Sequence, residues 1–204
     1  DTARALIAAS KTHQRDLAAW EARKTAAEAR IDALAVEAMD LSVPAPTAAA
    51  IDTVAKAIVA CRAAGKPVIV FTGAHLIKNG LGNLMAQLVR DGIVTSVAGN
   101  GATAIHDFEL ALIGQTSEYV PQALEKGQFG MAYEFAYINA AMALGDAAEL
   151  GMGESLGRTI CDPAFTKAVL AQAGARTDSP QHFDHADISL LAACYEHKVP
   201  FTVH

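Results

Sequence analysis

Residues 93–113 read IVTSVAGNGATAIHDFELALI, and this stretch decides the class of fold. The apolar, β-branched run over residues 93–98 is typical of a strand buried in a parallel sheet. A Gly-Asn-Gly turn follows at 99–101, and residues 104–113 then show a helical pattern. Strand, glycine turn and helix in this order predict one unit of a Rossmann-like α/β domain.

The same order appears on both sides of this stretch. Upstream, Pro67–Phe71 is a second β-branched run, predicted to be a strand buried on both faces, and Leu81–Arg90 is a predicted helix. Downstream, the sequence predicts helical segments over 129–156, over 162–173 with Asp162 as cap, and from Asp184 or Asp187 to about 197, then a strand over 199–203. Strands that alternate with helices predict a doubly wound or Rossmann-like parallel sheet with flanking helices.

The first 40 residues differ from the rest of the chain. They are rich in alanine and charge and contain no Gly or Pro, which predicts an N-terminal helical extension. Val43-Pro44-Ala45-Pro46 predicts a boundary near residue 45, with a helix capped by Thr47 after it. The expected domains are therefore 1–45, helical, and 46–204, Rossmann-like. Because a strand is predicted at the very end, we expect the sheet to be incomplete at the C-terminus.

The charge of the chain limits the partners that it could bind, and its cysteine content bears on its cellular location. The net charge of −6 leaves no basic footprint for nucleic acid or anionic membranes. No apolar run approaches the roughly 18 to 20 residues that span a bilayer. Three scattered cysteines without a CxxC motif favour reduced thiols. We expect a cytoplasmic protein that binds a small molecule and neither nucleic acid nor membrane.

The ends of the two predicted strands carry the candidate binding residues. Ligands of parallel sheets lie beyond the carboxyl ends of the strands, near a switch point in strand order. Glycines there let the backbone approach a ligand, helix-start amides can bind an anion, and a lysine can pair with it. The predicted binding residues are Gly73, Ala74, Lys78, Gly99, Asn100 and Gly101. The alternative is a pair of tight strand-to-helix turns without a ligand.

Acid–base candidates follow the second turn. If the helix begins near residue 104, then His106, Asp107 and Glu109 lie in its first turn beside the cleft. A histidine oriented by a carboxylate is a typical general acid or base. His75 is an equal candidate for that role, and the helix dipole alone also explains the two carboxylates.

A third polar segment, His182-Phe183-Asp184-His185-Ala186-Asp187, has spacing tolerable for two metal ligands. No HExxH or similar motif surrounds it. We interpret it as a polar loop that caps the following helix, and we predict no metal site.

Residues 92–112, with Gly-Asn-Gly at 99–101 and His106-Asp107 ahead of Glu109, resemble deoxyhypusine synthase-like proteins. With Gly73-Ala74-His75 included, the stretch is similar to a bacterial branch of that family over residues 66–120. The resemblance implies a Rossmann-like fold, NAD bound at the glycine turns, and a homo-oligomer. The family's catalytic lysine lies in a Trp-Gly-Lys segment that this chain lacks, so deoxyhypusine formation is not implied.

The leading functional hypothesis is an NAD-dependent transferase or lyase acting on a small amine or polyamine-like substrate. Asp107, Glu109 and Glu118 would receive the cationic substrate. Two alternatives remain: a sugar-phosphate isomerase or lyase whose glycine turns hold a phosphate, and a non-catalytic binding or scaffold protein.

Overall fold

The computed structural model describes residues 43–116 and 120–204. The chain divides into two compact units, residues 1–52 and 53–204. The helical extension predicted for residues 1–45 lies almost entirely outside the described residues. The domain boundary predicted near residue 45 stays a prediction. Helix α2, Ala45–Ala63, begins two residues before Thr47, the predicted cap.

Three short parallel strands form the sheet of the second unit. They are β1 (Ile69–Phe71), β2 (Ser96–Gly99) and β3 (Phe201–Val203), in the order β1-β2-β3. This confirms the predicted α/β class and its parallel sheet. The strand order follows the chain order, so the described strands contain no reversal. The switch point expected beside the ligand is therefore not present among them.

The two faces of the sheet differ in exposure. The register places Val70, Val97 and Phe201 side by side on one face, where they join the hydrophobic core. On the other face Ile69 is 53% exposed and Phe71 is 80% exposed. The prediction that residues 67–71 are buried on both faces is therefore wrong, because β1 is an edge strand. Burial on both faces holds for the central strand β2, where Val97 and Ala98 are both buried.

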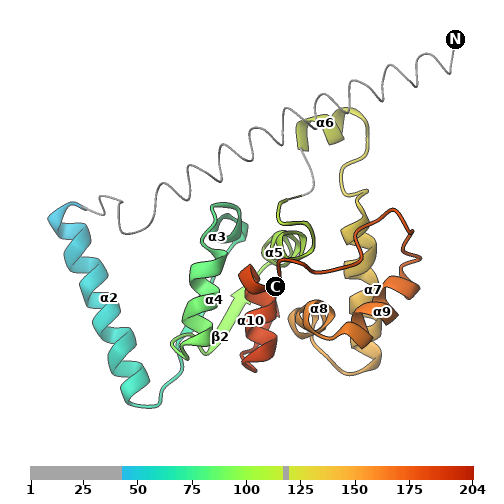
Figure 1. Ribbon diagram of the computed structural model, residues 1–204. Helices are drawn as coiled ribbons and strands as arrows, with labels where there is room; N and C mark the ends of the chain where they lie inside the picture. The colour runs from blue at the N-terminus through green and yellow to red at the C-terminus, as the bar shows by residue number, and fades with distance from the viewer. Residues whose placement is uncertain (1–42, 117–119) are drawn as a thin grey trace, which may run out of the picture. The chain divides into compact units, whose positions relative to one another are not determined.

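Helices connect the strands, and Figure 1 shows their course along the chain. Between β1 and β2 the chain forms α3 (Ala74–Lys78) and α4 (Gly82–Arg90). The helices between β2 and β3 are α5 (Gly101–Ile113), α6 (Val120–Glu125), α7 (Tyr133–Ala147), α8 (Met152–Cys161), α9 (Pro163–Gln172) and α10 (Leu190–Glu196), with the short 3-10 helix η2 (Ala186–Ile188) before α10. Helix α5 contacts β2, and α8 contacts β3.

Capping residues set several of these boundaries. The Asp162 carboxylate accepts hydrogen bonds from the backbone N–H groups of Ala164 and Phe165, which confirms it as the cap of α9. The prediction that Asp184 or Asp187 opens the last helix is wrong. Ser189 caps α10 instead, through a bond from the Ala192 amide to its hydroxyl.

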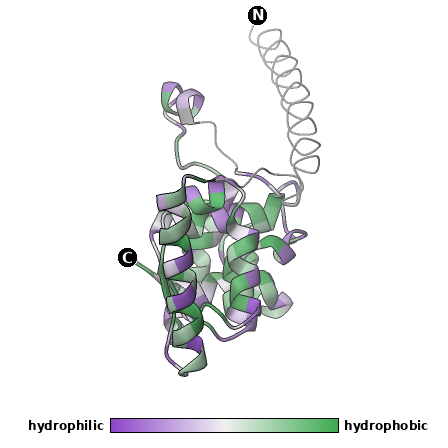
Figure 2. Cartoon of the chain, turned by 90° about the vertical axis from the view of Figure 1, so that its left-hand side faces the viewer, coloured by the Kyte–Doolittle hydropathy of each residue, from purple (hydrophilic) through white to green (hydrophobic). Residues whose placement is uncertain are grey.

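The core of the second unit lies between the sheet and its helices. Phe108 of α5 is fully buried and meets Phe183 edge-on, with ring centroids 5.0 Å apart. Polar and apolar residues alternate along the helices (Figure 2), as expected for helices with one buried side. No described helix is long and apolar enough to cross a bilayer.

Candidate functional site at the carboxyl edge of the sheet

The carboxyl ends of the three strands open into a cavity of about 450 Å³. Its lining residues come from the ends of β1, β2 and β3 and the turns after them: Phe71, Thr72, Gly73, Ala98, Gly99, Asn100 and His204. Three of the six predicted binding residues, Gly73, Gly99 and Asn100, are in this group. Ala74 and Gly101 directly follow two of them and begin helices α3 and α5.

Asn100 organises the second turn. Its side-chain oxygen accepts hydrogen bonds from the Thr103 amide and from the Thr103 hydroxyl, each at 2.9 Å. This capping box starts helix α5 at Gly101, three residues earlier than predicted. The sequence contains the signal for this capping box, an Asn three residues before a Thr. His106, Asp107 and Glu109 therefore do not lie in the first turn of the helix, and their predicted place there is wrong.

The three glycines of the turns have different surroundings. A Cβ atom at Gly101 would meet nothing within 4 Å, and one at Gly73 would meet only the side-chain nitrogen (Nδ2) of Asn100, at 3.9 Å. A Cβ at Gly99 would lie 3.1 Å from the Phe201 ring and 3.2 Å from Thr103. Gly73 and Gly101 thus leave open backbone for a ligand, whereas Gly99 allows β2 and β3 to pack closely.

Two predicted side chains on α3 are not among the lining residues. His75 and Lys78 are both exposed on this five-residue helix. Lys78 is its last residue, one turn from Gly73, where the chain enters the helix. Their predicted roles stay predictions.

His106 and Glu109 form a pair on α5. The His106 Nδ1 atom lies 3.0 Å from the Glu109 carboxylate, and the Glu109 side chain is only 3% exposed. The carboxylate thus orients the imidazole, as the sequence suggested for an acid–base pair. Neither residue lines the cavity at the strand ends, so the catalytic role of the pair stays a prediction.

Asp107 is fully engaged elsewhere. Its carboxylate accepts hydrogen bonds from the Ser189 hydroxyl at 2.7 Å and from the Leu190 and Leu191 amides at 2.9 and 2.8 Å. Burial raises the pKa of this carboxyl, against the lowering effect of those three bonds. The contacts assign Asp107 to holding the start of α10 and leave it no free oxygen for a cationic substrate. Glu118 lies outside the described residues.

The residues missed by sequence reasoning are Phe71, Thr72, Ala98 and His204. Each stands at or next to the end of a strand, and parallel strands end at one edge of a sheet. The Thr202 hydroxyl and the His204 Nε2 atom are 2.9 Å apart, and the His204 amide donates to the Gly99 carbonyl. Because parallel strands end at one edge of a sheet, the strand predicted over residues 199–203 could have indicated that His204 lies near Gly73. The large separation of the two residues in the chain hid this relation.

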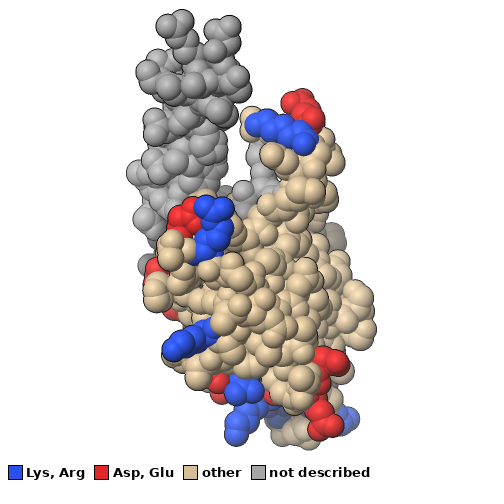
Figure 3. Space-filling model, turned by 90° about the vertical axis from the view of Figure 1, so that its right-hand side faces the viewer, with Lys and Arg blue, Asp and Glu red and all other residues tan. Residues whose placement is uncertain are grey.

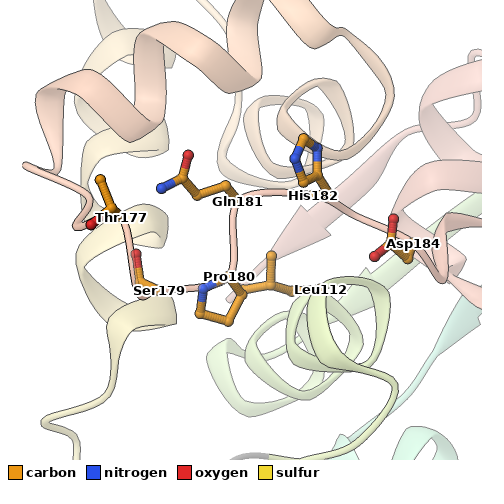
Figure 4. Close-up of a pocket in the computed structure, with 7 residues that line it drawn as sticks. All are labelled: Leu112, Thr177, Ser179, Pro180, Gln181, His182 and Asp184. Carbon is orange, nitrogen blue, oxygen red and sulfur yellow. The ribbon is translucent and has the colours of Figure 1, made fainter.

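A second cavity of about 490 Å³ lies between the end of α5 and the segment before η2. Figure 4 shows Gln181 and Thr177 on one side of it, His182 beyond them, and Leu112 with Pro180 at its base. His182 and His185 belong to the segment whose spacing was considered for a metal. His182 lines this cavity, whereas the ring of His185 packs against Gly114. In residues 43–116 and 120–204 no three His, Cys, Asp or Glu side chains are grouped to hold a metal ion.

On the face drawn in Figure 3 the charged side chains form no single cluster. Lysine, arginine, aspartate and glutamate lie mainly toward its rim, and residues of other kinds fill the middle.

The sequence of residues 52–157 matches the family described as "Arginine dihydrolase ArgZ-like, C-terminal, Rossmann fold". The matched region is more than half of the chain and contains both glycine turns. The chain belongs to this family. The resemblance to deoxyhypusine synthase-like proteins over residues 66–120 is therefore wrong, because the ArgZ-like match includes the whole of that segment. The NAD-dependent transferase or lyase function inferred from that resemblance is corrected with it.

The motif that suggested the other family has a structural explanation in this ArgZ-like domain. Glycine turns after parallel strands serve many Rossmann-like folds. The His106-Asp107 dipeptide looked catalytic, yet the structure uses Asp107 to anchor α10. Shared fold requirements thus produced a resemblance without a shared family.

Among solved structures, the ArgZ-like chain is similar to a conserved LOR/SDH-type protein from Methanococcus maripaludis S2. The two share 17% identity with a TM-score of 0.43, over 81% of this chain and 42% of the other. The chain thus spans less than half the length of that protein. Among curated proteins, none matches the sequence.

Proposed function

We propose that this chain is the nucleotide-binding module of an ArgZ-like protein, and that the cavity at the strand ends holds a phosphate-bearing cofactor. The family description names an arginine dihydrolase, so arginine or a related cationic amino acid is the substrate class of the whole protein. A cationic small molecule was also the partner expected from the sequence. NAD, the cofactor expected there, is the first nucleotide to test.

One observation carries this proposal. The backbone at Gly73 and Gly101 is open to a ligand at the edge of a parallel sheet, inside the region that matches the family. A phosphate can approach closely where no Cβ intervenes, and the Gly101 and Ala102 amides at the start of the 13-residue helix α5 can donate to it, since the Thr103 amide is taken by Asn100. Asn100 holds this helix start in place through its bonds to Thr103.

We assign the binding role to Gly73, Ala74, Asn100 and Gly101. Gly99 supports the site through packing. His106, oriented by Glu109, is the acid–base candidate that the contacts still favour, since its partner is buried and the imidazole is 24% exposed.

We also propose a cytoplasmic location and a homo-oligomeric state. The location is supported by three free cysteines, Cys61, Cys161 and Cys194. The net charge of −6 supports the further proposal that no nucleic acid is bound. Light scattering on the purified protein would give its mass in solution.

The test of nucleotide binding is a pair of glycine substitutions. Gly73 and Gly151 both precede a helix in extended backbone. A Cβ at Gly73 would meet only the side-chain amide nitrogen of Asn100, at 3.9 Å, and one at Gly151 would meet nothing within 4 Å. Only Gly73 lines the cavity. Gly73→Val should place a side chain in the cavity and weaken the binding of NAD, ADP and pyrophosphate at least about tenfold, while Gly151→Val should bind as the parent does.

Isothermal titration and the ligand-dependent shift in melting temperature give the two readouts. Equal losses in both variants would show a general effect on folding and count against the cavity. Failure of NAD, ADP and pyrophosphate alike to bind the parent chain would overturn the proposed function.

A further inference from the structure

The most exposed large apolar side chain of the sheet stands on the wall of this cavity. Phe71 is the last residue of β1 and is 80% exposed. Its ring borders the cavity together with Thr72 and Gly73, directly ahead of the turn assigned to the phosphate. An exposed phenyl ring is energetically unfavourable in water, so a ligand that covers it gains affinity.

The strand register shows what lies beside this ring. Phe71 pairs with Ala98, and Ala98 pairs with Thr202, so these three residues share one face at the strand ends. Ala98 has a small side chain that is 7% exposed and lies between Phe71 of β1 and Thr202 of β3. The two outer strands are two spacings apart, roughly 10 Å, which is wide enough for one planar ring. His204, held to Thr202, lines the cavity from the β3 side.

The polarity of the cavity wall differs from one end to the other. Phe71 and Ala98 are apolar, whereas the hydrogen-bonding groups of Asn100 and the start of α5 lie at the turn. The lining residues include no carboxylate and no lysine or arginine. Such a cavity suits a ligand with an uncharged planar group at one end and an anionic group at the other.

We propose that the aromatic base of the ligand stacks on Phe71 above Ala98 while its phosphate lies at Gly73 and Gly101. This inference rests on the proposed function and adds to it the side chain that binds the base of the nucleotide, Phe71. Phe71 then selects nucleotides over sugar phosphates and inorganic anions, because every base has a π-face that a phenyl ring can stack on.

The test compares ADP with pyrophosphate, which lacks the whole adenosine group, by titration calorimetry. In the parent chain the adenosine group should improve affinity at least about tenfold, and the Phe71 variants show how much of this gain comes from stacking of the base. Phe71→Ala should remove that gain and leave the affinity for pyrophosphate unchanged. Phe71→Tyr keeps a stacking ring and should restore the gain.

Ile69→Ala is the matched control, since Ile69 is 53% exposed on the same face of β1 but does not line the cavity. It should leave both affinities unchanged. Because both side chains are exposed, neither truncation removes core packing, and far-ultraviolet circular dichroism verifies the fold.

The outcomes separate this inference from the proposed function. Pyrophosphate that binds while the base adds nothing would overturn stacking on Phe71 and leave the anion site standing. Absence of binding by both ligands would overturn the proposed function and the inference with it. If Phe71→Ala and Ile69→Ala both lowered the mass in solution without changing ADP affinity, the face would be an interface between copies, and stacking would be overturned.

Discussion

At the scale of single residues, Asp107 shows how a buried carboxylate can organise a fold. It is 1% exposed, and its partners lie 82 to 84 residues further along the chain. The two amides it binds belong to the start of α10, where the helix dipole favours a negative charge. The carboxylate thus fixes α10 against α5 at the cost of being removed from water.

Asp107→Asn should lower the free energy of unfolding by about 1–3 kcal/mol at neutral pH, because an amide nitrogen would face an N–H donor and leave it unsatisfied. Urea unfolding followed by circular dichroism measures this change. Asp187→Asn removes the same charge from an exposed position and should have an effect within about 0.5 kcal/mol. Equal effects of the two substitutions would contradict the anchoring role.

The pH dependence of Asp107 has a definite sign. Burial raises its pKa, so the folded protein holds this proton more tightly than the unfolded chain does. Its contribution to stability is therefore full below the unfolded value and is lost as pH rises through the folded pKa, which lies above 3.8. The parent should lose stability relative to Asp107→Asn as pH rises across that window. The opposite slope would contradict the raised pKa.

At the scale of elements, two glycines one turn apart let helix α8 pack closely. A Cβ at Gly153 would collide with the Phe201 carbonyl of β3. A Cβ at Gly157 would lie 2.7 Å from both the Leu191 carbonyl and the Tyr195 Cβ of α10. Helix α8 therefore contacts a strand and a helix at backbone distance, which positions β3 and, with it, His204 at the edge of the cavity.

Gly157→Ala should destabilise the protein by about 1–3 kcal/mol, because overpacking against α10 outweighs the helix propensity gained by alanine. Thermal unfolding is the measurement. Gly101→Ala, where a Cβ meets open space, is the control and should change stability by no more than about 0.5 kcal/mol. A Gly157→Ala variant as stable as this control would show that α8 and α10 can separate without cost.

At the scale of the whole molecule, buried thiols report on global opening. Cys194 of α10 is 2% exposed, and burial, followed by the charge of Asp107, raises its pKa to about 12. Cys161 of α8 also has its pKa raised to about 12, by burial and then by Glu196. Only the thiolate reacts with alkylating reagents, so the raised pKa protects both thiols, and packing protects the buried Cys194 as well.

Iodoacetamide at pH 8 should label Cys194 on the order of a hundredfold more slowly in the native protein than in the guanidinium-unfolded chain, because labelling requires opening of the core. Peptide mass spectrometry follows each cysteine separately. A native rate within a few fold of the unfolded rate would show that the core around α10 opens readily, and would contradict the burial of this thiol.

The sequence by itself determined those features of the fold that depend on neighbours in the chain. β-Branched runs placed strands within a few residues of β1, β2 and β3, and Asp162 with Pro163 marked the start of α9. The two glycine turns of the candidate site were also visible, because turn and cap preferences act over a few residues.

Only the tertiary structure decided which of these residues serve the site. The edge position of β1 exposes Phe71, the convergence of strand ends brings His204 to the cavity, and α10 takes the carboxylate of Asp107. These outcomes depend on partners tens of residues away, and one residue pattern is compatible with several such partners. The sequence could therefore predict the turns at the strand ends, and only packing could separate the residues that line the cavity from those that hold the fold together.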